Sequence, residues 1–156
     1  MRVDEAELTR WGQVLGAGAT PPLTLALVGP LGAGKSVLAR AIGAGAGVSD
    51  PMPSPSYNLL FRYRTPSDRH VVHLDLYRLD APDELWELGW ASLGSDDEIV
   101  IIEWPERAGE LMPGDHWVIE LSHVEGSPEL RDVTLTRVGQ PAALPETPVA
   151  RGGAVG

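Results

Sequence analysis

Apolar residues along this chain change repeatedly between helical and strand-like spacing, so the hydrophobic pattern predicts a mixed α/β domain. Residues 4–15 carry an apolar stripe with helical spacing, and residues 23–28 are a short apolar run of strand length. Residues 36–46 return to helical spacing. The first predicted unit of the fold is therefore helix, strand, loop and helix.

The rest of the chain predicts mainly strands. Residues 57–64 and 70–77 are strand-like runs, and the polar spacer between them predicts an antiparallel hairpin. Residues 99–102 form a continuous apolar run, which is typical of a strand buried on both faces. The sheet is therefore expected to be mixed, partly antiparallel and covered by helices in three α/β layers. Further predicted elements are short helices at 83–90 and 105–111 and a terminal hairpin of strands 116–122 and 131–138.

The chain has 156 residues, the length of one domain. We expect this domain to span residues 1–138. Residues 139–156 contain several prolines, two adjacent glycines and no apolar period, which predicts a disordered C-terminal tail. Residues 48–55 contain three prolines, which exclude a helix and disfavour strand pairing.

The strongest chemical signal lies between the strand at 23–28 and the helix that follows it. Residues 29–36 fit the phosphate-binding loop G-x-x-x-x-G-K-[ST]. Lys35 is the one lysine among twelve cationic residues, and its compact ammonium fits a ring of backbone N–H groups that a planar guanidinium is too wide to enter. The flanking strand and helix argue against a chance glycine-rich turn. The pattern predicts a P-loop NTPase domain that binds a nucleotide at Leu31, Gly32, Ala33, Gly34, Lys35, Ser36 and Val37.

Magnesium needs further ligands in such a site. The Ser36 hydroxyl is expected on Mg²⁺, together with a carboxylate at the end of a neighbouring buried strand. Glu103 directly follows the apolar run 99–102 and takes this role in our assignment. Asp75 lies among apolar neighbours on a strand, and we expect it to order the attacking water or the outer shell of the metal. An ion pair with Arg78 or another arginine is the alternative for Asp75, and a solvated strand end is the alternative for Glu103.

The sequence leaves open the roles of two further features. Trp104 follows Glu103, where it either lines the nucleotide pocket or caps the strand hydrophobically. Ser54, Ser56 and Tyr57 are expected to pass near the γ-phosphate, where hydroxyl groups sense it as a switch does. Ordinary turn serines are the alternative for this segment.

Composition narrows the classes of function. The formal net charge is −10, so direct binding of nucleic acid over a broad face is not expected, because polyphosphate binding needs clustered cations. The chain has no cysteine, which excludes disulfides and zinc–thiolate sites and suits the cytoplasm. No stretch approaches the roughly 18 apolar residues of a membrane span. We therefore expect a cytoplasmic protein that does not contact a membrane.

Five motifs, in this order and spacing, resemble those of one family, TsaE (formerly YjeE), the small ATPase of tRNA threonylcarbamoyladenosine biosynthesis. The resemblance covers about residues 4–138. The phosphate loop is generic, whereas the motifs that contain Asp75 and Glu103 are quite specific. The motifs are Gly-Pro-Leu-Gly-Ala-Gly-Lys-Ser at 29–36, Ser-Pro-Ser-Tyr at 54–57, His-Leu-Asp-Leu-Tyr-Arg-Leu at 73–79, Glu-Leu-Gly-Trp at 87–90 and Ile-Glu-Trp-Pro-Glu-Arg at 102–107.

The resemblance implies a slow ATPase that binds a complex of TsaD and TsaB. ATP hydrolysis then supports this complex as it modifies the tRNA adenosine next to the anticodon, so that the ATPase meets tRNA only indirectly. Two residues in or beside the second motif depart from the family pattern. Ser56 replaces a usual threonine, and Pro53 stands where a lysine is common.

The resemblance also implies roles for single residues. Lys35 and Asp75 match the catalytic residues, and Ser36 with Glu103 matches the residues that hold Mg²⁺. Trp104 matches the tryptophan of the site. The segment around Glu5 and the last hairpin near Arg131 are expected to flank the adenine.

Two other functions stay open. A small-molecule kinase usually carries an arginine-bearing lid, but the stretch after Glu103 offers Arg107 and then no Lys or Arg until Arg131. A nucleotide-dependent scaffold with incidental hydrolysis is the second. A GTPase is disfavoured, because its guanine-reading motif needs a second lysine.

Overall fold

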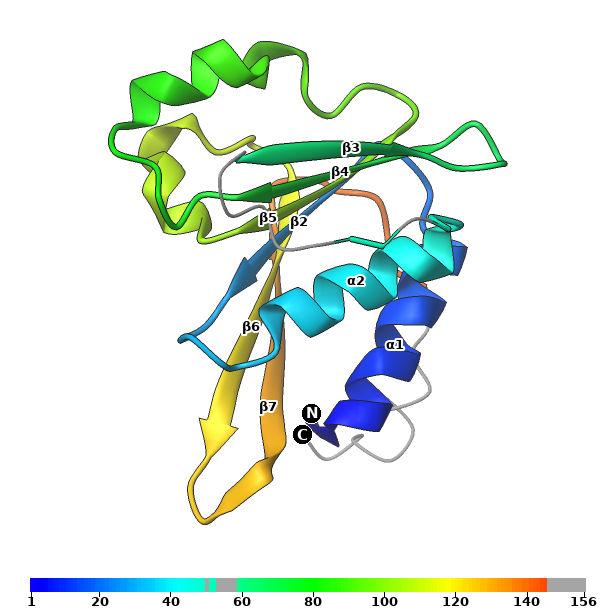
Figure 1. Ribbon diagram of the computed structural model, residues 1–156, viewed down its shortest axis with the longest axis vertical. Coiled ribbons are helices and arrows are strands. Elements are labelled where there is room, and N and C mark those ends of the chain that lie inside the picture. Colours follow the sequence, from blue (N-terminus) through cyan, green and yellow to red (C-terminus); the bar gives the residue numbers. More distant parts are fainter. Residues whose placement is uncertain (50, 53–58, 146–156) are drawn as a thin grey trace.

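A single mixed sheet forms the centre of the molecule (Figure 1). The computed structural model describes residues 1–49, 51–52 and 59–145. Across the described residues the seven strands run in the order β1-β7-β6-β2-β5-β4-β3. Strands β6, β2, β5 and β4 are parallel, and the pairs β3–β4, β6–β7 and β1–β7 are antiparallel. The strands are β1 (Arg2–Asp4), β2 (Leu23–Val28), β3 (Leu60–Arg64), β4 (His70–Asp75), β5 (Glu98–Glu103), β6 (His116–Val124) and β7 (Ser127–Val138).

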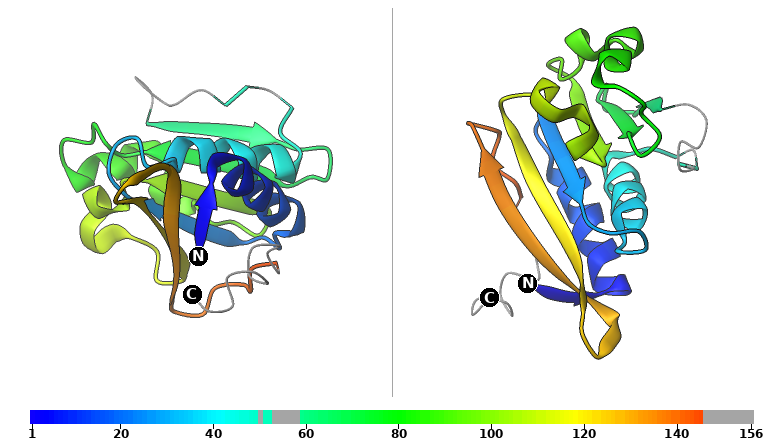
Figure 2. Two further views of the ribbon diagram at one scale, coloured as in Figure 1. Left: turned by 90° about the horizontal axis from the view of Figure 1, so that it is seen from below. Right: turned by 90° about the vertical axis from the view of Figure 1, so that its left-hand side faces the viewer.

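Two α-helices pack side by side on one face of this sheet (Figures 1 and 2). Helix α1 (Glu5–Gly18) begins with a capping box, in which Glu7 N donates to Asp4 Oδ1 at 2.8 Å and Asp4 N donates to Glu7 Oε1 at 3.0 Å. Helix α2 (Lys35–Ala46) crosses α1 very closely. A Cβ atom at Gly16 would lie 2.0 Å from the carbonyl oxygen of Ile42, so this crossing requires glycine.

The opposite face of the sheet carries a second layer made of 3₁₀ helices. Alternate side chains of β5 point to the two faces: Ile101 joins the core under α1 and α2, and Ile102 joins a second core with Leu85 and Ala108. The predicted three-layer α/β fold with a partly antiparallel sheet is therefore confirmed. The short helices expected at 83–90 and 105–111 are 3₁₀ rather than α-helical, and Gly109, at φ 56° and ψ −128°, breaks the second of them. The 3₁₀ helices are η1 (Pro82–Leu88), η2 (Trp90–Ser92) and η3 (Pro105–Leu111).

The central strands bring the predicted chemistry to one edge of the sheet. Strand β2 lies between β5 and β6, and its Leu27 pairs in register with Glu103 at the end of β5. Asp75 at the end of β4 pairs with Glu103 from the other side. The loop after β2, Glu103 and Asp75 therefore meet at the carboxyl edge of the parallel strands, where α/β sheets commonly bind ligands.

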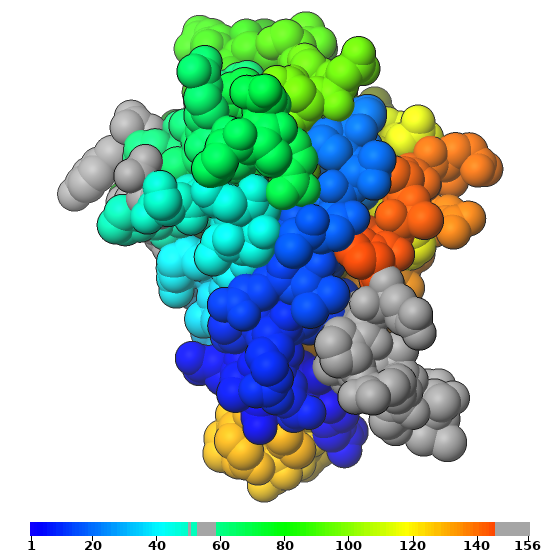
Figure 3. Space-filling model, turned by 90° about the vertical axis from the view of Figure 1, so that its right-hand side faces the viewer, coloured from blue at the N-terminus to red at the C-terminus, as the bar shows by residue number. Residues whose placement is uncertain are grey.

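The two predicted hairpins are present, with shifted ends. Strands β6 and β7 turn at residues 125–126, so Ser127 and Pro128 belong to β7 and not to the loop. The tip of this hairpin projects past the first turn of α1 (Figure 1, Figure 2, right, and Figure 3). Strand β1 was not predicted from the sequence. It pairs with β7, where the amino group of Met1 also donates to the Val133 carbonyl at 2.8 Å.

The Arg69 side chain joins the loop between β3 and β4 to the ends of both α-helices. Its guanidinium donates to the carbonyl oxygens of Gly16 at 3.2 Å, Ala19 at 3.1 Å and Ala46 at 3.0 Å. The last carbonyl groups of a helix lack intrahelical partners and carry partial negative charge. Arg69 therefore caps α1 and α2 together.

The segment predicted to be a disordered tail lies partly within the described residues. Trp117 Nε1 donates to the Ala142 carbonyl at 2.8 Å, and the backbone N–H of Gln140 donates to Asp115 Oδ1 at 2.9 Å. Ala142 and Leu144 also pack against the larger core. Residues 139–145 thus contact the domain, and its packing continues beyond the predicted boundary at Val138. Residues 146–156 are outside the described residues.

No helix in the described part of the chain is long and apolar enough to cross a membrane.

Candidate nucleotide-binding site

The loop between β2 and α2 has the backbone geometry of an anion cradle. Gly29 packs so closely that a Cβ atom would lie 2.4 Å from the Leu121 carbonyl oxygen. Gly34 is the N-cap of α2 at φ 107° and ψ 11°, a conformation that residues with a Cβ rarely adopt. As described, this N-cap supplies no side-chain acceptor to the first N–H groups of the helix. These N–H groups and the helix dipole therefore favour an anion such as phosphate.

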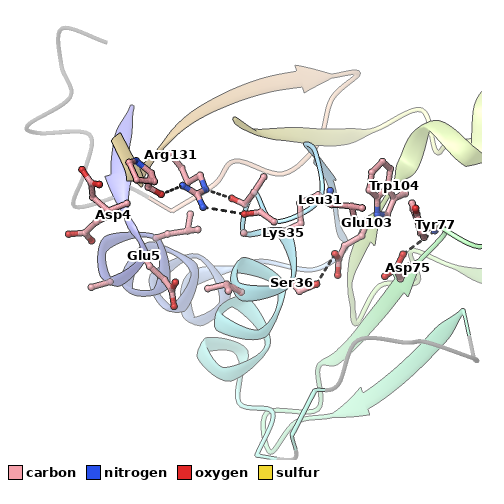
Figure 4. Close-up of a pocket in the computed structure, with 18 residues that line it drawn as sticks. Asp4, Glu5, Leu31, Lys35, Ser36, Asp75, Tyr77, Glu103, Trp104 and Arg131 are labelled. Atoms are coloured by element: carbon pink, nitrogen blue, oxygen red, sulfur yellow. Dashed lines mark hydrogen bonds between the residues drawn. The ribbon is translucent and has the colours of Figure 1, made fainter. Parts of the chain in front are cut away.

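A cavity of about 720 Å³ lies over this loop (Figure 4). Its volume is within the range of small-molecule and cofactor sites. Three segments line it: the loop and first turn of α2, the ends of β4 and β5, and the junction of β1 and α1 with β7. Every residue of the predicted site is among the lining residues, namely Glu5, Leu31, Gly32, Ala33, Gly34, Lys35, Ser36, Val37, Asp75, Glu103, Trp104 and Arg131.

Lys35 occupies the centre of the cradle. Its side chain is 6% exposed, and its Nζ donates to the carbonyl oxygens of Gly29 and, at 3.2 Å, Pro30. Nζ also lies 3.9 Å from the ring centroid of Trp104. Burial lowers the pKa of Lys35, and the nearby Glu103 carboxylate opposes this shift. Two neutral carbonyl oxygens thus hold the ammonium in the cradle. A charged phosphate group would attract it more strongly than these carbonyl groups do.

Ser36 and Glu103 form a pair of hard oxygen donors. Ser36 Oγ donates to Glu103 Oε1 at 3.1 Å, and the Glu103 side chain is only 2% exposed, so Glu103 is not a solvated strand end. Among the described residues there is no group of three His, Cys, Asp or Glu side chains suited to a metal. Mg²⁺ binds through one or two protein oxygens and takes its remaining ligands from phosphates and water. The donors present therefore fit Mg²⁺ bound together with a nucleotide.

Asp75 lies beside this pair at the end of β4. Its Oδ1 accepts a hydrogen bond from the backbone N–H of Tyr77 at 3.0 Å. Within the described residues Asp75 forms no ion pair, so the alternative pairing with Arg78 is not observed. Burial raises the pKa of Asp75, and the negative charge of Glu103 raises it further. A half-buried carboxylate of raised pKa is well suited to orient a water molecule and to accept its proton.

Trp104 lies between the cavity and the second core. Its ring lines the cavity beside Lys35, contacts Tyr77 with a centroid separation of 4.9 Å, and also packs against the second core. Its backbone has φ 58° and ψ 51°, the left-handed region that bulky residues seldom adopt. Residues held in such a conformation cluster at functional sites, because the surrounding structure must enforce it.

Arg131 closes the far end of the cavity and holds the phosphate loop from across the molecule. Its Nε donates to the Ala33 carbonyl at 3.1 Å, and its Nη2 donates to the Gly32 carbonyl at 3.2 Å (Figure 4). Its Nη1 donates to Pro128 O at 2.7 Å. Glu5 lies at the same end, at the start of α1. The expected position of Glu5 and Arg131 beside an adenine stays a prediction.

The structure adds residues that the sequence analysis did not assign. His73 is buried against Glu103, and the ring of Tyr77 lies tilted against that of Trp104 at the cavity wall. The spacing of His73 and Asp75 could have indicated that His73 lies near the site, because residues two apart on a strand share a face. Ser54, Ser56 and Tyr57, predicted to be switch-like, lie outside the described residues.

Comparison with known proteins agrees with this geometry. Residues 3–132 match the family model of the threonylcarbamoyl adenosine biosynthesis protein TsaE. The TsaE protein of Mycobacterium tuberculosis is 37% identical over 126 residues, which are 76% of this chain and 73% of that protein. The TsaE protein of Haemophilus influenzae is 28% identical over 142 residues, covering 88% of this chain and 89% of that protein.

A solved structure supports the fold separately. The crystal structure of Bacillus subtilis YdiB superposes with a TM-score of 0.67, covers 89% of this chain and 84% of its own, and is 24% identical in sequence. This similarity supports the mixed α/β fold described above. The family model matches residues 3–132, and the cradle and the carboxylates at the ends of β4 and β5 agree with this match. The chain therefore belongs to the TsaE family of threonylcarbamoyl adenosine biosynthesis proteins.

Proposed function

We propose that this protein binds ATP with Mg²⁺ in the cavity over the phosphate loop and hydrolyses it slowly. The observation that carries the proposal is the meeting of four groups at one edge of the sheet. They are the Lys35 ammonium in the cradle, the Ser36–Glu103 oxygen pair, and the Asp75 carboxylate beside it. Phosphoryl transfer requires positioning and charge neutralisation of this kind more than covalent chemistry by the protein.

Each group has a separate task in this proposal. The N–H groups of the loop and Lys35 hold the phosphates, so that Lys35 leaves the carbonyl oxygens of Gly29 and Pro30. Ser36 and Glu103 hold Mg²⁺, which neutralises phosphate charge when bound. Asp75 orients the attacking water and accepts its proton.

We further propose that the protein acts through partner proteins in tRNA modification. Its family belongs to threonylcarbamoyladenosine biosynthesis, and the partners in this proposal are homologues of TsaD and TsaB. A chain of net charge −10 has little cationic surface for tRNA, so the partners hold the tRNA and this protein meets it only indirectly. The proposal also includes a location in the cytoplasm, away from membranes.

The test combines ATP binding with ADP release. The purified protein should bind a fluorescent ATP analogue in the presence of Mg²⁺ and release ADP slowly, and addition of a TsaD–TsaB pair should raise the rate. The Lys35→Ala variant should lose both analogue binding and ADP release. Arg10 is exposed on α1, so Arg10→Ala is the control that removes one positive charge elsewhere. Stimulation by a metabolite from a panel of sugars and acids, but not by the proteins, would favour a small-molecule kinase instead.

A further inference from the structure

A buried histidine contacts the carboxylate that we assign to Mg²⁺. His73 lies on β4 and is 1% exposed, and its Nε2 is 2.6 Å from Oε2 of Glu103, which is 2% exposed. The other carboxylate oxygen, Oε1, accepts the hydroxyl of Ser36. His73 does not line the cavity, so it has no direct part in the proposed function.

The surroundings of the imidazole define which nitrogen carries hydrogen. Its Nδ1 is buried and has no hydrogen-bond partner among the described residues. A neutral imidazole has one N–H donor and one bare acceptor nitrogen. A buried N–H without a partner costs a full desolvation penalty, whereas Glu103 offers an acceptor to Nε2. The neutral tautomer with hydrogen on Nε2 therefore fits this site.

This hydrogen bond restricts how the Glu103 carboxylate can turn. The terminal torsion of a glutamate is broad and roughly two-fold, so an unrestrained carboxylate samples many orientations. His73 pairs with Ile101 across the β4–β5 register, two residues before the pairing of Asp75 with Glu103, so the rigid sheet fixes the donor. With Oε2 held by Nε2–H, Oε1 is directed at Ser36.

We propose that His73 is a positioning residue that presets the Ser36–Glu103 pair for Mg²⁺. The inference rests on the proposed function, because it assumes that this pair holds the metal. Hydrogen-bonding partners of metal ligands typically contribute about 10–100-fold to metal affinity. Loss of the His73 donor should therefore raise the Mg²⁺ concentration needed for nucleotide binding by about 10–100-fold, with little change in binding of nucleotide without metal.

Two substitutions at the same position test this role. His73→Phe keeps a planar ring but removes the donor, and His73→Gln keeps an amide N–H near the place of Nε2. The measurement is a Mg²⁺ titration of the binding of a fluorescent ATP analogue, repeated with EDTA. His70→Phe is the control, because His70 lies on the same strand but is hydrogen-bonded to Asp97, which does not line the cavity. Thermal unfolding of each variant establishes whether it is folded.

The expected result is a raised Mg²⁺ requirement in His73→Phe, a requirement close to that of the parent in His73→Gln, and an unchanged requirement in His70→Phe. A folded His73→Phe with the parental Mg²⁺ requirement would overturn the role of His73 while leaving the proposed function in place. A parent protein that does not bind the analogue at all would instead overturn the proposed function, and this inference with it.

Nuclear magnetic resonance gives a readout that needs neither metal nor nucleotide. Long-range ¹H–¹⁵N spectra of the imidazole in the parent protein should show hydrogen on Nε2 of His73. Hydrogen on Nδ1 with none on Nε2 would overturn the proposal, even if His73→Phe fails to fold.

Discussion

Replacing Arg131 by alanine tests whether the last hairpin holds the phosphate loop in its binding conformation. The substitution removes the two hydrogen bonds from the guanidinium to the carbonyl oxygens of Gly32 and Ala33. A hydrogen bond from a charged group contributes about 1.5–3 kcal/mol. One of the two bonds is exposed to solvent, so we assign about 1.5–3 kcal/mol to the pair.

We expect this loss to appear in binding, because the loop must then be ordered at the expense of binding energy. A loss of 1.5–3 kcal/mol corresponds to a rise in Kd of about 10- to 150-fold. The assay is displacement of a fluorescent ATP analogue, with hydrogen exchange of the loop amides as a second readout. Arg137→Ala is the matched control: it removes an arginine from the same strand, where the guanidinium lies 5.2 Å from the Trp117 ring. Arg131→Lys keeps the charge but not the two-donor fork, so its Kd should lie between those of the parent and the alanine variant.

A competing explanation is that Arg131 contacts the adenine, as the sequence led us to expect. The two roles differ in their effect on tripolyphosphate, which has no base. If Arg131 holds the loop, Arg131→Ala weakens the binding of tripolyphosphate and the binding of ATP by similar factors. Weaker ATP binding with unchanged tripolyphosphate binding would assign Arg131 to the base. Unchanged Kd for both, with unchanged exchange of the loop amides, would refute the reasoning.

Five other substitutions address the site and the fold. Lys35→Ala should abolish tight ATP binding and leave the fold intact, because its charge is needed only with phosphate; near-normal affinity for a fluorescent analogue in the folded variant would exclude a phosphate loop. Glu103→Ala should raise the Mg²⁺ requirement, whereas Asp75→Ala should spare binding and slow ADP release by ~10²–10⁴; parental hydrolysis in both variants would contradict these assignments. Asp75→Asn should stabilise the nucleotide-free protein increasingly as the pH rises above 3.8, the pKa of Asp75 in the unfolded state. The reason is that burial raises the native pKa of Asp75, so the native state binds the proton more tightly and the parent loses stability as pH rises through that window; a pH-independent difference in urea unfolding would contradict it. Arg69→Ala should lower the free energy of unfolding by about 2–3 kcal/mol, because three helix-end carbonyl groups lose a charged donor; an unchanged urea midpoint would show that solvent replaces these bonds.

The sequence by itself determined the phosphate loop and the elements that flank it. A loop of this kind is local: the glycines, Lys35 and Ser36 are consecutive, and the strand and helix on either side have their own apolar periods. The continuous apolar run 99–102 likewise predicted a strand buried on both faces, with Glu103 at its end. Parallel neighbours then bring their carboxyl ends to one edge, so local patterns were sufficient to place Ser36 and Glu103 together.

Only the tertiary structure decided which distant segments complete the site. The contact of Arg131 with the loop spans 98 residues along the chain, and β1 reaches the cavity by pairing with β7 near the other end of the domain. The burial of His73 against Glu103 depends on the order of β4 and β5 in the sheet. Apolar periods of 2 and 3.6 residues report which face of an element is buried, but not which element covers it. That choice is made by packing between segments far apart in sequence, and here it placed His73 and Arg131 at the site.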